Sequence, residues 1–217
     1  TPELARSLPE AFPAVDDCIT GEGERPLQAL VASLRGNTAV SPTWVFAAEP
    51  QVAAPVNAPK PATIADLDTL PLPDYSDYFV ELAASGLNFI PHLPVEFSRG
   101  CWWNRCAFCN LNLQWQGYRH KSADRMLAEI RTLTSRHRCL DFFFTDNALP
   151  PAEAGPLFQA LAAEPVDRRF FAEIRAMRQS DHYALYRRGG LTEVQVGVEA
   201  LSDSLLARLR KGVRAID

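Results

Sequence analysis

The sequence predicts an α/β fold in which a parallel sheet forms an incomplete, TIM-barrel-like (β/α) barrel. From residue 94 onward, four apolar strand candidates alternate with four amphipathic helix candidates. The strands are nearly continuous apolar runs, which is typical of a parallel sheet covered by crossover helices. A closed barrel has eight such units, so we expect an open sheet. The strands are expected at 94–98, 139–144, 169–174 and 193–198, and the helices at 122–137, 152–163, 180–188 and 202–211.

The first part of the chain is predicted to be the end of a separate, Rossmann-like α/β domain. Short strands at 14–20 and 43–47 flank a helix at 21–36. That helix carries an apolar face of Leu27, Leu30, Val31 and Leu34. The proline-rich stretch 54–62 indicates a linker. The predicted domains are therefore 1–56 for the α/β part, 57–93 for the linker and 94–217 for the barrel.

The helices of the second part have clear local signals. Ser122 is a good N-cap for the helix at 122–137. Gly212 ends the helix at 202–211. The buried stripe of the first of these helices is predicted to be Met126, Leu127, Ile130 and Leu133.

The composition argues against a nucleic-acid-binding protein and against a membrane protein. The net charge is −4 with a pI near 5.6, which argues against a broad nucleic-acid surface. No apolar run approaches the roughly 20 residues of a membrane helix, and no signal peptide is visible. We therefore expect a cytoplasmic protein that binds neither membrane nor nucleic acid. Because the sequence begins Thr-Pro without a methionine, we expect a fragment.

The stretch "EFSRGCWWNRCAFCNLN" holds three of the five cysteines. Cys101, Cys106 and Cys109 form C-x-x-x-x-C-x-x-C directly after a predicted strand, and thiolates are soft ligands for iron–sulfur clusters or zinc. A structural zinc site has four protein ligands, and no fourth ligand is obvious here. The spacing favours a four-iron cluster with one open iron, with zinc or core cysteines as alternatives. Cys18 and Cys139 lie in apolar strands, where we expect buried structural roles.

Several motifs occur in an order that resembles radical SAM enzymes with an N-terminal cobalamin-binding domain. They are "SRGCWWNRCAFCNLN", "FFFTDN", "FFAEIRA", "VQVGVEALSDSLLARLRKGVRAID" and "DLDTLPLPDYSDYF". The resemblance covers residues 15–217 and points to the branch linked to maturation of ribosomally made peptides. The usual triplet is C-x-x-x-C-x-x-C, so this chain has one extra residue in the first gap.

The resemblance implies a [4Fe-4S] cluster held by the three cysteines, with S-adenosylmethionine on the open iron. Phe108 would lie beside the adenine, and Glu199 near the ribose hydroxyls. Asp146 and Asn147 follow a strand and could face the methionine or substrate, or could simply form a turn.

Other residues are singled out by their place on strands. Glu173 and Arg175 share a strand face and could form a carboxylate–guanidinium pair. Gln195 shares the face of Gly197 in the fourth strand, and we expect it to contact the cofactor, as we do for Glu173 and Arg175. Trp102 and Trp103 would shield the metal or pack in the core, and Lys211 is a weak candidate for a carboxylate contact.

The expected function is reductive cleavage of S-adenosylmethionine to modify a carbon of a peptide or small molecule. Cobalamin-dependent methyl transfer is one form of this reaction. No D-x-H-x-x-G motif occurs, so cobalamin is expected only in a full-length parent. The expected partners are the substrate and an electron donor such as a flavodoxin or ferredoxin, and the isolated chain is expected to lack turnover. The alternatives are a methylthiotransferase-like enzyme and a zinc-stabilised, non-catalytic binding module.

Overall fold

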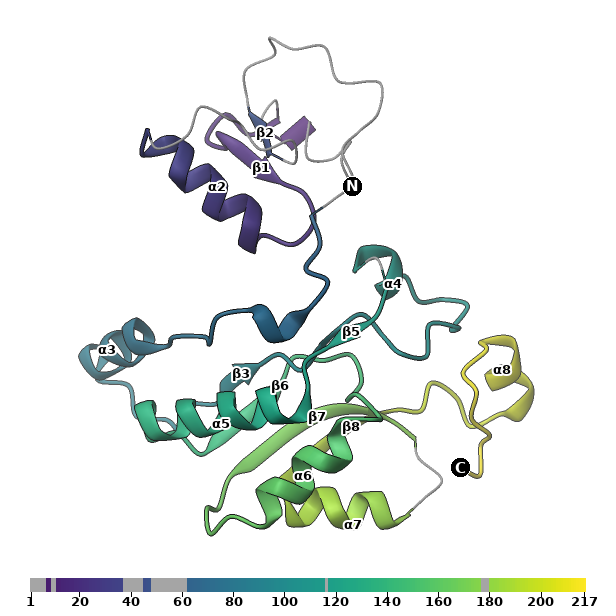
Figure 1. Ribbon diagram of the computed structural model, residues 1–217. Helices are drawn as coiled ribbons and strands as arrows, with labels where there is room; N and C mark the ends of the chain where they lie inside the picture. Colours follow the sequence, from purple (N-terminus) through teal and green to yellow (C-terminus); the bar gives the residue numbers. More distant parts are fainter. Residues whose placement is uncertain (1–6, 9–10, 37–44, 48–61, 116, 177–179) are drawn as a thin grey trace. The chain divides into compact units, whose positions relative to one another are not determined.

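The computed structural model describes residues 7–8, 11–36, 45–47, 62–115, 117–176 and 180–217 (Figure 1). The chain divides into two compact units, Thr1–Ala65 and Asp66–Asp217. None of the helices in the described ranges is long and apolar enough to cross a membrane.

Among its described residues, the first unit contains a two-stranded ribbon and the helix α2 (Glu24–Leu34). Strand β1 (Asp17–Ile19) pairs with β2 (Val45–Ala47), and α2 lies between them in sequence. The two strands are antiparallel, whereas a Rossmann-like arrangement would make them parallel. On α2, Leu27 and Leu34 of the predicted apolar face are 53% and 75% exposed. Within the described part of this unit, that face is therefore largely uncovered.

The second unit begins earlier than the sequence predicts. The 3-10 turn η1 (Leu67–Thr69) and helix α3 (Ser76–Ser85) lie inside the stretch expected to be a linker. Leu67 is fully buried, and the Asp68 carboxylate accepts the Ser122 N–H at 2.8 Å. The Tyr75 hydroxyl donates to the Pro94 carbonyl at 2.6 Å. These contacts hold the stretch that contains η1 and α3 against the rest of the second unit. The stretch is therefore part of that unit rather than a linker.

The main sheet has four parallel strands in the order β3-β6-β7-β8. Within the described residues, β3 and β8 each pair on one side only. The sheet is therefore open, and the prediction of a partial (β/α) barrel is confirmed. The strands are β3 (Leu93–Val95), β6 (Asp141–Phe144), β7 (Arg169–Arg175) and β8 (Leu191–Gly197).

Three helices run along the sheet in Figure 1 and build the core with it. They are α5 (Ala123–His137), α6 (Ala154–Ala162) and α7 (Ser180–Arg188). The predicted stripe of α5 is buried, and Ser122 caps the helix by accepting the Arg125 N–H at 3.1 Å. Four phenylalanines that are at most 2% exposed pack at the centre through stacked and edge-to-face contacts: Phe142, Phe144, Phe158 and Phe170. Burial of each ring stabilises the fold by roughly 1.5–3 kcal/mol.

Two glycines explain how α7 turns into β8. A Cβ at Gly189 would overlap the carbonyl oxygen of Phe158, and a Cβ at Gly190 would overlap that of Arg168. Only glycine allows the backbone between α7 and β8 to pass so close to Phe158 of α6 and to Arg168, the residue before β7. The result is a tight connection that brings β8 onto the sheet with its carboxyl end on the same side as the other strands.

Candidate metal and cofactor site

A long loop between β3 and α5 carries the three clustered cysteines. Its base is closed by a short antiparallel pair, β4 (Ser98–Arg99) with β5 (Arg119–His120), and helix α4 (Leu111–Gln114) lies within it. The Lys121 N–H donates to the Phe97 carbonyl at 2.8 Å just below this pair. Because the loop follows β3, it stands at the carboxyl edge of the sheet, where active sites of such barrels lie. We call residues 100–118 the cysteine loop.

The donor set of the cysteine loop fits an iron–sulfur cluster. Cys101, Cys106 and Cys109 line one hollow together with Asn104, Arg105 and Leu111. All five cysteines of the chain are outside disulfides. Among the described residues, no three Cys, His, Asp or Glu side chains are gathered around one point suitable for a single ion. A four-iron cluster does not need that, because each thiolate binds a different iron.

Asp146 joins the end of β6 to the start of the cysteine loop. It is 2% exposed; its Oδ2 accepts the Phe97 N–H at 2.9 Å, and its Oδ1 accepts the Ser98 hydroxyl. Burial raises the pKa of this carboxyl to about 7, although both hydrogen bonds act in the opposite direction. The neighbouring Asn147 reaches the Gly100 carbonyl at 3.5 Å. Both residues, expected to face the methionine or substrate, here contact the backbone that leads into the loop.

The pair predicted between Glu173 and Arg175 is not formed among the described residues. The guanidinium of Arg175 instead lies 4.4 Å from the ring centroid of Trp103 and 5.3 Å from that of Trp102. Its Nη2 also donates to the Lys211 carbonyl. Arg175 is the last residue of β7, so its side chain extends past the sheet edge to the two indoles rather than back along the strand.

The segment after β8 forms the other side of the site. It contains the short helix α8 (Asp203–Arg208). The buried Lys211 donates from Nζ to the Glu199 carboxylate at 2.8 Å. The sequence points to both residues but not to this pair, since a spacing of twelve with a left-handed backbone at Glu199 (φ 64°) gives no recognisable pattern. Gln195, expected to bind cofactor, is exposed on β8.

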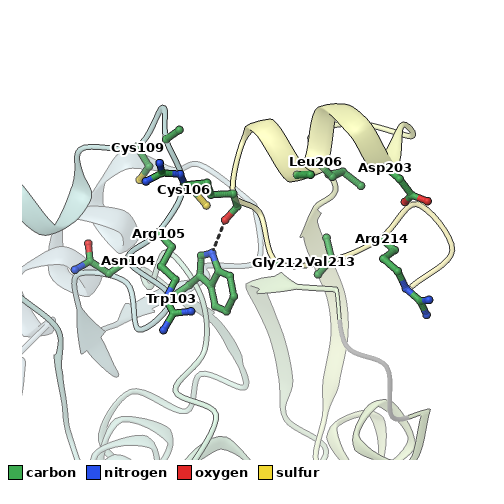
Figure 2. A pocket seen from close by; sticks show the side chains of 13 residues that line it. Trp103, Asn104, Arg105, Cys106, Cys109, Asp203, Leu206, Gly212, Val213 and Arg214 are labelled. Carbon is green, nitrogen blue, oxygen red and sulfur yellow. Dashed lines mark hydrogen bonds between the residues drawn. The ribbon is translucent and has the colours of Figure 1, made fainter.

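Backbone and indole contacts join the cysteine loop to this segment. The Trp103 Nε1–H donates to the Arg210 carbonyl at 2.9 Å, as the dashed line in Figure 2 shows. The Ala107 N–H donates to the Leu209 carbonyl at 3.0 Å. Trp103 thus packs between two polypeptide segments, which explains one of the two adjacent tryptophans.

A cavity of about 840 Å³ lies between the loop and the α8 segment (Figure 2). Cys106 and Cys109 form part of its wall, so the expected metal ligands are reachable from this side. Phe108 lies between them in sequence and is 56% exposed, which leaves its ring available to a ligand. Cys139, by contrast, is 5% exposed and donates to the Pro91 and Asp141 carbonyls, as expected of a structural cysteine.

The family model of the radical SAM superfamily matches residues 95–215. The chain belongs to the radical SAM superfamily. This membership confirms the resemblance to radical SAM enzymes and, with it, the S-adenosylmethionine and iron–sulfur cofactors expected of that family. It also favours the enzyme over the zinc-stabilised binding module.

Two curated proteins are similar to the chain over nearly its whole length. It is 28% identical to the hopanoid C-3 methylase of Methylococcus capsulatus over 97% of the chain. It is 27% identical to the anaerobic magnesium-protoporphyrin IX monomethyl ester cyclase of a Synechocystis species over 92% of the chain. The chain spans about 40% of the length of each of these relatives.

Solved structures confirm the fold. The cobalamin-dependent radical enzyme OxsB, with aqua-cobalamin and S-adenosylmethionine bound, matches all of the chain with a TM-score of 0.74 at 19% identity. The methyltransferase TsrM from Kitasatospora setae, with cobalamin and a [4Fe-4S] cluster bound, matches 98% of it with a TM-score of 0.68 at 20% identity. The chain covers 32% and 44% of these two proteins.

Proposed function

We propose that this protein is a cobalamin-dependent radical SAM enzyme that transfers a methyl group to an unactivated carbon. The observation that carries the proposal is that Cys101, Cys106 and Cys109 line the same hollow at the carboxyl edge of the parallel sheet. Methyl transfer is supported by the hopanoid methylase among the relatives and by the methyltransferase TsrM among the solved structures.

Residues of this chain would hold the cluster, bind S-adenosylmethionine and exclude water. The three thiolates would hold the cluster and leave one iron for the amino and carboxylate groups of S-adenosylmethionine. A cluster held by these residues would supply the electron for reductive cleavage of S-adenosylmethionine. Phe108 would lie along the adenine, and Glu199 and Gln195 would contact the ribose side. Trp102 and Trp103 would keep water from the metal ligands.

Cobalamin binding is proposed for the whole protein rather than for a particular residue of this chain. The likeness to OxsB and TsrM extends over 98–100% of the chain, including the first unit. Both of those proteins are described with cobalamin bound. The sequence has no D-x-H-x-x-G ligand motif, so any cobalamin would be held without a histidine of that kind from this chain.

The substrate class and setting follow from the same comparisons. We propose a carbon of an apolar small molecule or a peptide as the methyl acceptor, a separate protein as electron donor, and the cytoplasm as the compartment. Five cysteines outside disulfides support a reducing compartment. Ring formation is a second candidate reaction, because the cyclase relative matches the chain as well as the methylase does.

Anaerobic reconstitution of the full chain tests the proposal. We expect about four irons per chain, loss of that iron in the Cys101→Ala, Cys106→Ala, Cys109→Ala triple variant, and full retention in Cys139→Ala. With S-adenosylmethionine labelled in its methyl group, label in the product supports methyl transfer, and an unlabelled product supports ring formation. Full iron and sulfide in the triple variant would rule out the cluster site.

A further inference from the structure

The cysteine loop is preceded by a short stretch that leaves the sheet at the end of β3. Val95 is the last residue of β3, and its carbonyl accepts the N–H of Thr145, just after β6, at 3.0 Å. Six positions after Val95 comes Cys101, the first of the three thiols proposed to hold the cluster. The place of this thiol therefore depends on what fixes residues 96–100.

Asp146 fixes this stretch at two adjacent points. Its Oδ2 accepts the Phe97 N–H at 2.9 Å, and its Oδ1 accepts the Ser98 hydroxyl. The carboxyl group thus uses both of its oxygens on residues that lie four and three positions before Cys101. Asp146 is 2% exposed, so bulk water does not compete for these hydrogen bonds, and the low local dielectric strengthens them.

The backbone on both sides of Asp146 is held by the sheet. Before Asp146, strand β6 pairs with β3 and with β7. After it, the Leu149 N–H donates to the carbonyl of Glu173 in β7 at 3.3 Å. The neighbouring Asn147 donates from Nδ2 to the Gly100 carbonyl at 3.5 Å, immediately before the first cysteine. The carboxyl of Asp146 is therefore attached to a fixed part of the fold and can determine where the loop starts.

The surroundings of Asp146 extend to the first thiol. Tyr118 lies at the other end of the cysteine loop, and burial raises the pKa of its hydroxyl. The negative charges of Asp146 and of Cys101 both raise that pKa further. The carboxyl, the phenol and the thiol are therefore within electrostatic reach of one another, so Asp146 is close to a proposed ligand as well as to the backbone that carries it.

We propose that Asp146 is a positioning residue for the cluster: its carboxyl determines where the cysteine loop leaves the sheet and thereby where Cys101 lies. The role rests on the proposed function, since it requires a cluster on the three thiols. It differs from contact with the methionine or substrate, because the buried carboxyl is already hydrogen-bonded to Phe97 and Ser98. A ligand that is held in place beforehand binds metal more tightly, because less conformational entropy is lost on binding.

Anaerobic reconstitution of the full chain with Asp146→Ala tests this role. The variant removes both acceptors, so iron per folded chain should fall. The chelator bathophenanthroline should remove the remaining iron about tenfold faster or more. Asp146→Asn should restore both properties, because the amide can still accept the Phe97 N–H and donate to the Ser98 hydroxyl. Ser98→Ala removes one of the two bonds and should give an intermediate rate.

Asp141→Ala is the matched control. Asp141 is also buried, at 5% exposed, and it begins the same strand β6. It pairs with Arg169 at 2.7 Å, at the amino edge of the sheet and away from the cysteine loop. Its loss should lower stability in urea without changing iron per folded chain or the rate of chelation. The control therefore separates positioning of the loop from a general loss of stability.

Three outcomes would overturn the positioning role. They are iron content and chelation rate of Asp146→Ala equal to those of the unaltered protein, an equal effect in Asp141→Ala, and a defect in Asp146→Asn as large as that in Asp146→Ala. If Asp146→Ala does not fold, Ser98→Ala decides, and an unchanged chelation rate in that variant overturns the role. If the unaltered protein forms no cluster, the proposed function itself is wrong. If it forms one and the variants match it, only the role of Asp146 is wrong.

Discussion

The indole of Trp103 lies directly against Gly212, so closely that a Cβ at position 212 would overlap the ring carbons Cζ2 and Cη2. Gly212 also has a left-handed backbone, with φ at 77°. Two independent reasons thus require glycine here: the backbone conformation and the packing of a tryptophan from the cysteine loop. The sequence signal for a helix end at Gly212 accounts only for the first reason.

Gly212→Ala is expected to displace the indole and loosen the cysteine loop. Gly86→Ala is the matched control, because Gly86 has nearly the same φ (69°) but no neighbouring atom within 4 Å of the place that a Cβ would occupy. Both variants bear the cost of a left-handed alanine, roughly 1–2 kcal/mol. Only Gly212→Ala should also lower iron per chain after reconstitution. Equal iron content in the two variants would show that the Trp103 contact does not position the loop.

Arg175→Lys is expected to alter the cluster environment while preserving charge. Lysine lacks the planar guanidinium, so it cannot cover both indoles and also donate to the Lys211 carbonyl. We expect normal iron content but a changed electron paramagnetic resonance spectrum upon addition of S-adenosylmethionine. The exposed Arg187→Lys is the control. A spectrum identical to that of the unaltered protein would mean that Arg175 only fills space.

The sequence predicts the parallel order of the sheet and the α5 stripe because both rest on local periodicity. It also predicts the cysteine loop, since the thiols lie within nine residues of one another. The sequence predicts the wrong partner for Arg175. A spacing of two shows that Glu173 and Arg175 share a strand face, but it does not show that two indoles lie beyond the end of the strand. The stretch that contains η1 and α3 likewise has the composition of a linker. Composition does not reveal that it packs against the sheet unit, because that packing depends on a hydrogen bond between Asp68 and Ser122, which are 54 positions apart in the sequence.

Asp146→Asn is expected to remove part of the pH dependence of stability. The folded pKa of about 7 lies above the ordinary value of 3.8 for this side chain. Between these values the folded protein binds a proton that the unfolded chain does not, so the free energy of unfolding falls as pH rises toward 7. Burial raises the pKa of Glu129 as well, in spite of Lys121, and contributes in the same direction.

Urea unfolding from pH 5 to pH 8 measures this effect. The unaltered protein should lose stability over that range, and Asp146→Asn should show a flatter profile, because the amide can still accept the Phe97 N–H and donate to the Ser98 hydroxyl. Asp124→Asn, at an exposed position in the first turn of α5, should leave the profile unchanged. Parallel profiles for all three proteins would contradict the assigned role of Asp146.

Lys121 and Glu129 form an almost fully buried ion pair at the point where the cysteine loop passes into α5. Their charged atoms are 2.7 Å apart, and the side chains are 4% and 1% exposed. The other carboxylate oxygen of Glu129 has no hydrogen-bond partner among the described residues. A lone charge left here would be strongly unfavourable, because it would be neither hydrated nor paired.

Lys121→Met is therefore expected to lower the free energy of unfolding by roughly 3–5 kcal/mol, whereas the Lys121→Met, Glu129→Leu double variant should lose far less. Arg131→Met is the control for an exposed pair: its guanidinium lies 2.7 Å from Glu164 but the side chain is 55% exposed, so the loss should stay below about 1 kcal/mol. Urea unfolding of the four proteins at one pH gives the comparison. If the double variant were as unstable as Lys121→Met, packing around the lysine stem, and not the unpaired carboxylate, would be the cause. If neither variant lost stability, the pair would contribute nothing to the junction between the loop and α5.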